Sequence, residues 1–351
     1  MPLTAGTDLP GFGGVPAEHY ARASRAADAI LYDGYLIRPA SRRGVTNQRP
    51  RRVGVLVPRP WAVGNLPFDT GVDGSVESFF SRTEVVAECP PDTQLTVRLR
   101  FLQPQRRSLE RYLPGTGFVP TSQLDIDGWR VTSADEAIPH ERDVRVAVES
   151  LLREPVEAGF DAIETTELET VRDATGAVRG RIRRICRPLR IRLQLAAVDA
   201  GLVVPMVRLR SLVENVTPSL SVDASPADAA LHSLVSAHLI LALSDGGFAS
   251  LLDPPPWAAD AAADCTNIHA FPVLVGEAGR DDLMLSAPVE LPDYPRAEPL
   301  TLGDALDAAG AAPTAGTLPT PITPATYPTG PLPSAADSSP QAHWVVVRST
   351  A

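Results

Sequence analysis

Alternation of apolar and polar side chains dominates the chain between about residues 80 and 210. From Leu95 to Phe101, every second residue is apolar and the residues between them are threonine or arginine. The same period recurs at residues 144–148, 190–195 and 207–210. Because successive side chains of a strand point to opposite faces, this pattern predicts strands with one face on a core and the other in solvent.

Turn residues separate these predicted strands. Asp199-Ala200-Gly201 lies between two of them and predicts a hairpin turn. Residues 173–176 predict a second turn, between strands at 164–171 and 178–185. Closely spaced strands with little helix between them predict a mainly-β fold, either an antiparallel β-sandwich or a barrel-like sheet.

The longest apolar run extends from Leu231 to Ala258 and is interrupted by Asp245-Gly246-Gly247. We expect the flanking segments, Ser233–Leu243 and Phe248–Leu252, to form a central hairpin, because a second apolar segment follows the Gly-Gly turn at once. Their nearly continuous apolar character predicts burial on both faces. A buried helix over residues 228–243 is the competing interpretation, since periodicity does not separate it from a buried strand.

The N-terminal part differs in its period. Residues 1–14 are expected to form a flexible leader, and apolar side chains then recur every three to four residues between Tyr20 and Leu31, which predicts a short helix. Residues 15–60 therefore hold this N-terminal helix and an arginine-rich connection. Within the connection, residues 53–57 are typical of a short strand.

The remaining chain divides by composition. Residues 61–308 are expected to form the β-rich globular domain, in which Pro254–Pro256 end one sheet because proline cannot donate to a ladder. Two later strands are predicted at residues 271–275 and 283–291. Residues 309–351 are rich in proline, threonine and alanine, and this C-terminal tail is predicted to be disordered.

Charge and residue usage restrict the chemistry. The chain has no lysine, so all 32 basic residues are arginine, which excludes Schiff-base chemistry and a phosphate-loop lysine. A coding bias toward arginine explains the same observation. Residues 1–219 hold 29 arginines against 27 acids, whereas residues 220–351 hold 3 against 15. The net charge of −10 argues against nucleic-acid binding. The acidic last third is compatible with a docking surface for a basic partner, and the alternative is that its charge only keeps the protein soluble.

The compartment is predicted from cysteine usage and hydropathy. Cys89, Cys186 and Cys265 are widely spaced and make neither a disulfide framework nor a zinc pattern. No basic segment followed by an apolar one marks a signal peptide, and no apolar run is long enough to span a bilayer. We therefore expect a cytoplasmic protein without membrane insertion.

Outward-facing arginines are the most distinctive candidate site. If the strands that carry them are neighbours, they form a basic band able to bind carboxylate or phosphate groups of a partner. The alternative is a solvated face on which glutamates of adjacent strands neutralise the arginines. The partner-binding candidates are these arginines and one tryptophan: Arg98, Arg100, Arg190, Arg192, Arg208, Arg210 and Trp257.

Other candidate chemistry is sparse. Cys265, Asn267 and His269 form a C-x-N-x-H pattern, but zinc requires three or four protein ligands and no second Cys/His pair accompanies it. His232 and His238 lie in an apolar run, where hydrogen-bonded core histidines are more common than ligands. No metal or cofactor is therefore expected. No hydrolase, dinucleotide or metalloprotease motif is present, which favours a protein that is not an enzyme.

Four tracts carry a family resemblance: Ile30–Arg38 (ILYDGYLIR), Ser233–Trp257 (SLVSAHLILALSDGGFASLLDPPPW), Phe271–Gly276 (FPVLVG) and Leu285–Asp304 (LSAPVELPDYPRAEPLTLGD). Together they resemble an uncharacterised bacterial family encoded in nickel–iron hydrogenase gene clusters. In the family this tract continues into an acidic helical end, whereas in this chain it gives way after Ala308 to the proline-rich tail. The resemblance implies an accessory role in hydrogenase assembly or complex formation, and it assigns no residue a role.

Three function classes remain open from the sequence. The leading hypothesis is a non-catalytic accessory protein that binds a partner protein, such as a hydrogenase subunit or maturation factor. The alternative is an enzyme or small-ligand-binding protein with a pocket near Cys265, His269 and Trp257. A carbohydrate-binding sandwich is less well supported, because four tryptophans and six tyrosines give few stacking platforms.

Overall fold

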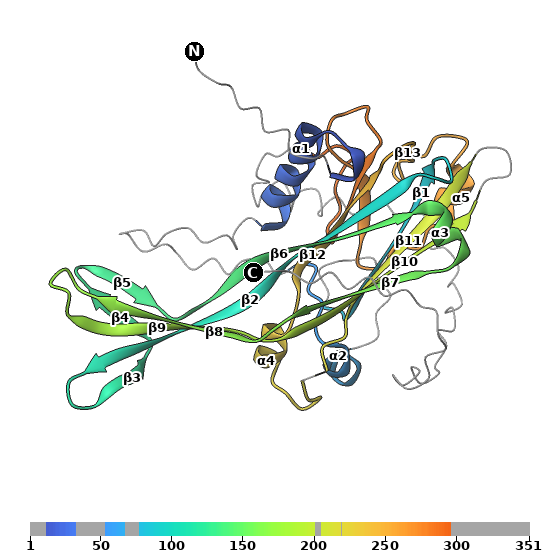
Figure 1. Ribbon diagram of the computed structural model, residues 1–351. Helices are drawn as coiled ribbons and strands as arrows, with labels where there is room; N and C mark the ends of the chain where they lie inside the picture. The colour runs from blue at the N-terminus through green and yellow to red at the C-terminus, as the bar shows by residue number, and fades with distance from the viewer. Residues whose placement is uncertain (1–11, 33–52, 67–76, 201–204, 219, 296–351) are drawn as a thin grey trace, which may run out of the picture.

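The fold of the chain is mainly β. The computed structural model describes residues 12–32, 53–66, 77–200, 205–218 and 220–295. Two antiparallel sheets stack into a body, and long strands continue from one end of this body as a projecting arm (Figure 1). The predicted mainly-β class and its antiparallel sheets are therefore confirmed.

The first sheet has five strands and lies entirely in the body. Its order is β13 (Gly247–Phe248), β1 (Phe80–Glu88), β11 (Met206–Asn215), β10 (Leu189–Asp199) and β7 (Val156–Ala162). Asp199 at the end of β10 pairs with Val207 in β11. This register confirms that the two strands are antiparallel neighbours, as the predicted turn required.

The second sheet has eight strands and extends from the body into the arm. Its main order is β14 (Phe271–Leu274), β15 (Leu283–Ala287), β12 (Val235–Leu243), β2 (Gln94–Leu113), β9 (Val178–Cys186) and β8 (Thr165–Arg172). Two further strands, β3 (Gly117–Thr121) and β6 (Ala134–Ala147), pair with β2. A separate hairpin consists of β4 (Gln123–Ile126) and β5 (Trp129–Thr132).

Strand β2 joins the body to the arm. Its 20 residues span about 65 Å at the usual rise of a strand. Residues 95–102 pair with β12 in the body, and residues 105–111 pair with β9 in the arm. On its other side β2 pairs first with β6 and then with β3. The body and the arm therefore share one continuous backbone.

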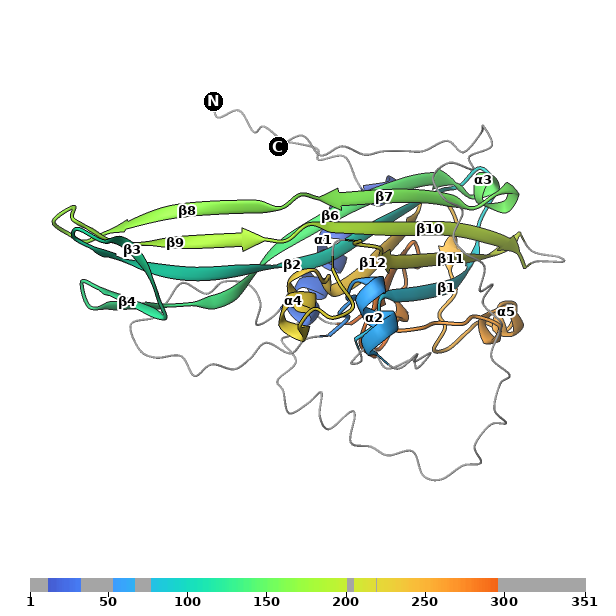
Figure 2. The same cartoon turned by 90° about the horizontal axis from the view of Figure 1, so that it is seen from below.

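A second connection comes from the other sheet. Only Ile163 and Glu164 separate β7 from β8, and only Arg187 and Pro188 separate β9 from β10. Because β7 pairs with β10 and β8 with β9, the four strands form one long two-stranded ribbon. Figure 2 shows β7 and β8 in line along one side of the molecule. The arm is thus attached to both sheets of the body.

The main core lies between the two sheets of the body. The apolar side chains of β2 that alternate from Leu95 to Phe101 face it, as do those of β10 from Leu189 to Ala197. The arm has a small core of its own, formed by Leu109, Leu124 and Ile182. The face predicted to be buried in these strands is buried.

The apolar run that contains β12 is a strand, as predicted, but it does not form a hairpin. All nine residues of β12 are buried, and the strand lies centrally between β2 and β15. After the turn at Asp245–Gly247 the chain crosses to the other sheet, where Phe248 pairs with Ala87 of β1. The hairpin prediction was wrong because apolar character indicates burial but does not specify the partner strand.

The predicted N-terminal helix is confirmed as α1 (Ala17–Ala27), which continues into the π-helical turn η2 (Asp28–Tyr32). It covers the outer face of β12 and β15, where Ala23 and Ala27 are fully buried. The flexible leader was predicted to extend too far, because Phe12 is buried in this cluster within the short turn η1 (Phe12–Gly14). Residues 1–11 lie outside the described residues.

Several element boundaries also differ from the prediction. Val148 begins helix α3 (Val148–Arg153) instead of ending a strand, and the strand predicted at 283–291 ends at Ala287. In the short strand predicted at 53–57, only Leu56 makes isolated bridges. The predicted tail at 309–351 lies outside the described residues. The remaining helices are α2 (Arg59–Asn65), α4 (Pro226–Leu231) and α5 (Ala259–Ala263).

Among the described residues, none of the helices combines the length and apolar character that crossing a membrane requires.

Candidate functional site

The six candidate arginines do not form one band. Arg98 and Arg100 lie on β2, whereas Arg190, Arg192, Arg208 and Arg210 lie on β10 and β11 of the other sheet. Since both sheets turn their apolar side chains toward the shared core, the two arginine sets point away from each other. The prediction of a single band was wrong, because alternation gives the face of a strand and not the sheet to which it belongs.

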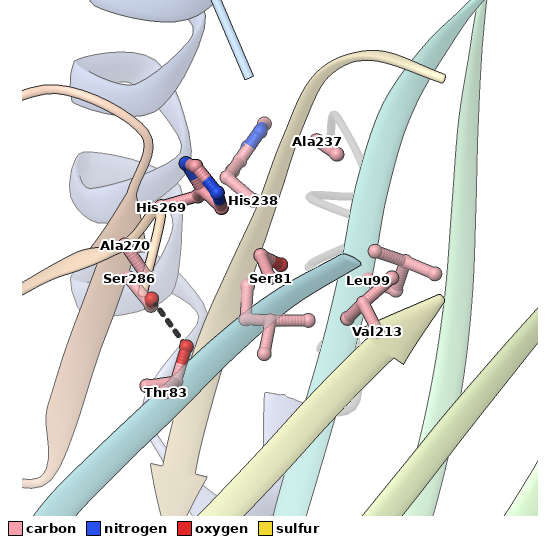
Figure 3. A pocket seen from close by; sticks show the side chains of 10 residues that line it. Ser81, Thr83, Leu99, Val213, Ala237, His238, His269, Ala270 and Ser286 are labelled. Atoms are coloured by element: carbon pink, nitrogen blue, oxygen red, sulfur yellow. Dashed lines mark hydrogen bonds between the residues drawn. The ribbon is translucent and has the colours of Figure 1, made fainter. Parts of the chain in front are cut away.

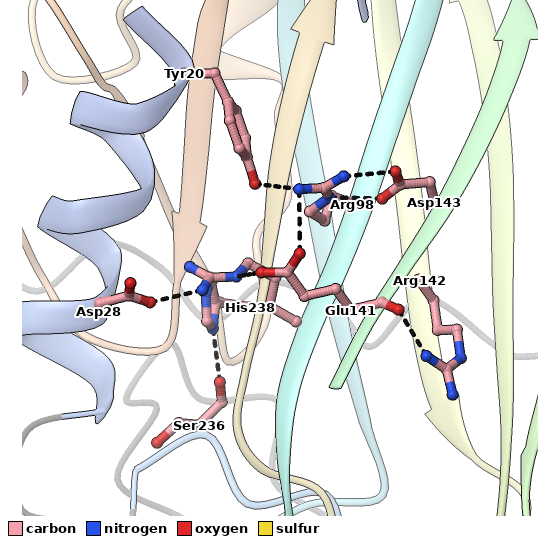
Figure 4. A network of polar contacts seen from close by, with 9 residues as sticks. Tyr20, Asp28, Arg98, Glu141, Arg142, Asp143, Ser236 and His238 are labelled. Atoms are coloured by element: carbon pink, nitrogen blue, oxygen red, sulfur yellow. Dashed lines mark hydrogen bonds and ion pairs between the residues drawn. The ribbon is translucent and has the colours of Figure 1, made fainter. Parts of the chain in front are cut away.

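Arg98 fastens the N-terminal helix to the second sheet. Its Nε and Nη2 atoms donate to the two carboxylate oxygens of Asp143, both at 2.7 Å, and Nη1 donates to the Tyr20 hydroxyl at 2.6 Å (Figure 4). The guanidinium also lies 4.6 Å from the centre of the Phe12 ring. Two strands and the N-terminal helix therefore meet at this one side chain.

Arg100 is the most buried of the candidate arginines, with only 4% of its surface exposed. Its Nη2 donates to Asp28 at 2.6 Å, and its Nε donates to Glu141 at 2.8 Å. Burial alone would lower the pKa of Arg100, but Tyr32 and Asp28 raise it above its usual value. Arg100 is therefore a charged structural residue beneath η2.

His238 lies beside Arg100 and is a neutral core histidine. Its Nδ1 donates to the carbonyl of Ser236 at 2.7 Å, and its ring meets Tyr32 edge-on at 5.5 Å. Burial, and then the charge of Arg100, lowers the pKa of His238 to about 3. His232 likewise donates Nδ1 to the carbonyl of Asp228 at 2.9 Å. Both contacts fit the core histidines predicted from the sequence.

On the outer face of the five-stranded sheet, the arginines pair with buried acids. Arg210 Nε donates to Glu84 at 2.5 Å, and Arg192 Nε donates to Glu214 at 2.7 Å. Glu84 is 1% exposed and also accepts the Thr266 amide at 2.8 Å. Burial would raise the pKa of Glu84, but hydrogen bonds from arginine and the Thr266 amide lower it, so the carboxylate stays ionised.

The other two arginines of this face also have acidic partners. Arg190 lies 3.1 Å from Asp161, and Arg208 lies 3.6 Å from Asp264. Each candidate arginine is therefore neutralised by an acid, as the alternative interpretation of the sequence expected. Their role in partner binding stays a prediction.

The C-x-N-x-H pattern is dispersed rather than gathered into a site. Cys265 donates its thiol to the carbonyl of Ala261 at 3.4 Å, and burial raises its pKa to about 11. The side-chain oxygen of Asn267 accepts the Glu84 amide at 2.7 Å. Trp257, the remaining partner-binding candidate, is 40% exposed on the loop before α5. Among the described residues, no three His, Cys, Asp or Glu side chains approach one another as metal ligands do.

A crevice between the sheets contains His269 (Figure 3). Thr83 and Ser286 share a hydrogen bond of 2.7 Å across it. The lining residues are Ser81, Thr83, Leu99, Val213, Ala237, His238, Leu239, His269, Ala270 and Ser286. The space has no room for a water molecule, and neither Cys265 nor Trp257 reaches it. This crevice is therefore not the pocket expected near Cys265, His269 and Trp257.

The arm contains the most accessible strand of the described chain. β8 is the terminal strand of its sheet, and all residues from Ile163 to Thr170 are exposed. Ile163 is 77% exposed and Leu168 is 58% exposed. The strand was predicted at 164–171 but not as a site, although the segment TTELETVR contains only one large apolar residue before Val171 and is thus typical of a strand exposed on both faces.

At the tip of the arm, the β4–β5 turn and the β8–β9 turn are joined by a hydrogen bond. Asp127 and Gly128, both at positive φ, form the turn between β4 and β5. The carboxylate of Asp127 accepts the Ala174 amide from the β8–β9 turn at 2.7 Å. Asp173 accepts the hydroxyl and amide of Thr175 and the Nε of Arg179, and these bonds lower its pKa to about 2. The two turns at the end of the arm are therefore hydrogen-bonded to each other.

No protein-family model matches the sequence, and no curated protein matches it.

Proposed function

We propose that this protein is a non-catalytic accessory protein that binds a partner protein through its arm. The observation that supports this proposal is the exposed edge strand β8, which projects beyond the body. The partner we propose is a nickel–iron hydrogenase subunit or maturation factor, on the resemblance of the four sequence tracts alone. The setting we propose is the cytoplasm, which suits the three free cysteines Cys89, Cys186 and Cys265.

Rigidity supports a binding role for the arm. The arm continues from both sheets of the body, and ion pairs cross it where β6, β2 and β9 lie side by side. Glu136 accepts from Arg107 at 2.5 Å and from Arg184 at 3.1 Å. A surface that is already ordered loses less conformational entropy when it binds a partner.

The alternative is an enzyme or small-ligand-binding protein that uses Cys265, His269 and Trp257. Its support is weaker, because the raised pKa keeps the Cys265 thiol protonated at neutral pH, and a thiol is a poor nucleophile. The crevice beside His269 has no room for a substrate. No observation in the described chain places these three side chains around a common space.

Site-specific crosslinking in cells tests the proposed function. A photo-reactive residue at Ile163, which is 77% exposed beside β8, should crosslink one protein in stoichiometric yield. The matched control is Val63 on α2, which is 69% exposed and lies on the body. The proposal predicts a specific product at Ile163 alone, identified by mass spectrometry as a hydrogenase subunit or maturation factor. The same products at both positions, or none at Ile163, would contradict a binding role for the arm.

A further inference from the structure

The free edge of β8 is unusual among the edges of the two sheets. Proline protects strand edges because it cannot donate to a ladder, and it interrupts β3 at Pro120, β6 at Pro139 and β14 at Pro272. β13 is only two residues long. Strands β7 and β8 contain no proline and together form one continuous edge. Ala158 and Phe160 of β7 are buried in the core of the body, whereas no residue of β8 is buried, so β8 is the more accessible part.

Acidic side chains line this edge. Residues 156–172 contain a single basic residue, Arg172. The acidic residues of the same segment are Glu157, Asp161, Glu164, Glu167 and Glu169. On the inner side, Arg184 of the neighbouring strand β9 donates to Glu169 at 2.7 Å, and Arg187, which follows β9, donates to Glu164 at 3.1 Å. On the outer side the position of the next strand is empty in the described chain.

Charge determines which strand fits that position. Side chains directly opposite each other on neighbouring strands stabilise the sheet when their charges are opposite and destabilise it when they are alike. Arg184 of β9 lies opposite Glu167 of β8. A strand added on the outer side of β8 therefore needs a basic side chain opposite Glu167 and another opposite Glu169. Between them, an apolar side chain would cover Leu168, which is 58% exposed.

A second copy of the same strand fits poorly in the registers centred on residues 167–169. An antiparallel pair related by a two-fold axis is centred on one residue, because opposite side chains must point to the same face of the sheet. A pair centred on Leu168 places Glu167 opposite Glu169 of the other copy. A pair centred on either glutamate places it opposite itself. Each of these registers sets like charges against each other, which disfavours self-association.

We propose that β8 accepts an extended strand of the partner protein in which arginine or lysine alternates with apolar residues. The incoming backbone hydrogen-bonds to the free edge of β8, and its basic side chains face Glu167 and Glu169. This proposal rests on the proposed function in that the occupant is a protein segment. It goes further by stating the chemistry and the conformation of that segment.

Peptide binding to the full-length protein tests the proposal. The probe is a synthetic eight-residue peptide of alternating arginine and valine, with an acidic peptide of alternating glutamate and valine and a proline-interrupted basic peptide as controls. Fluorescence anisotropy at physiological ionic strength should show binding of the basic peptide alone. Hydrogen exchange should show new protection of amides between Thr165 and Arg172. Equal binding of the proline-interrupted peptide, or binding without this protection, would overturn strand addition.

Matched charge reversals sharpen the result. Glu167→Arg should weaken binding of the basic peptide at least tenfold, because a repulsive pair replaces an attractive one. Glu18→Arg makes the same charge change at an exposed position of α1 and should leave binding unchanged. Equal weakening by both variants would show that net charge attracts the peptide and would overturn the edge site. If the peptide fails while crosslinking at Ile163 still succeeds, the proposed function stands and only strand addition is wrong.

Discussion

The body and the arm share the long strands β2 and β6, yet they bury very different surfaces. In the body, β2 is buried almost without interruption from Leu95 to Gln103, whereas its last three residues in the arm are exposed. The sandwich core contains side chains from both sheets, but the arm's described core has three buried members. This difference indicates that stability resides in the body, while the arm provides surface.

The largest expected effect comes from the core of the body. Leu239 of β12 is 2% exposed and packs between the sheets. Leu239→Ala should lower the free energy of unfolding by about 2–5 kcal/mol, because it leaves a cavity that the surrounding strands cannot fill. Chemical denaturation followed by circular dichroism checks this value. A loss below 1 kcal/mol would contradict a close-packed core at this position.

Acid pH should weaken the body before it weakens the tip of the arm. Burial lowers the pKa of His238 to about 3, whereas an unfolded histidine titrates near 6.5. As pH falls below about 6.5, the unfolded chain therefore binds a proton that the folded chain does not. The expected loss from His238 at pH 4 is about 3 kcal/mol. At the tip, the pKa of Asp173 is about 2, so its bonds are lost only as pH falls from about 4 toward 2.

Denaturation curves between pH 4 and pH 7.5 check this order. His238→Asn should flatten the dependence of stability on pH, because it removes the titrating imidazole, whereas Asp173→Asn should leave it unchanged over this range. Equal slopes for wild type and His238→Asn would contradict a neutral buried histidine.

A substitution in the arm should act locally. A Cβ atom at Gly180 would overlap the carbonyl oxygen of Glu110 and the Leu124 side chain. Gly180→Val should therefore open the arm at a cost of about 1–3 kcal/mol without unfolding the body. Limited proteolysis should give cleavage between residues 105 and 187 and leave the body's thermal transition in place. Unfolding of the arm and the body in one cooperative transition would contradict the expectation that the arm opens independently.

The smallest effect is expected on the outer arginine face. Arg190 and Asp161 are 59% and 62% exposed, so their ion pair is well solvated. Arg190→Ser should change the free energy of unfolding by less than about 0.5 kcal/mol. It should also leave the yield of partner crosslinked through a photo-reactive residue at Ile163 unchanged, since the arm and not this face is proposed to bind the partner. Thermal denaturation and the crosslinking yield measure both quantities, and a lost crosslink would restore the arginines as binding candidates.

The sequence predicted the strands far better than their arrangement. Alternation from Leu95 to Phe101 identified both the strand and its buried face, since burial of one face is a local property of a strand. The separation of Arg98 from Arg190 depends on which strands pair, and side-chain period carries no such information. The false hairpin after Leu243 has the same cause, because an apolar segment packs equally well in either sheet.

The arm was missed for a related reason. The strand at 164–171 was predicted, but its few apolar residues did not show that it ends its sheet and is exposed on both faces. What makes it a site is the position beside it, which no described strand occupies where the chain passes from β7 in one sheet to β8 in the other. Such a change of sheet depends on contacts between residues distant in sequence.

Hydrogen exchange on the full chain, alone and with the partner crosslinked at Ile163, tests the central claim most directly. The account predicts that new protection appears in residues 163–172 and that the exchange of β10, β11 and β12 in the body is unchanged. Protection confined to the body, or an unchanged β8, would contradict the claim that the arm is the binding surface.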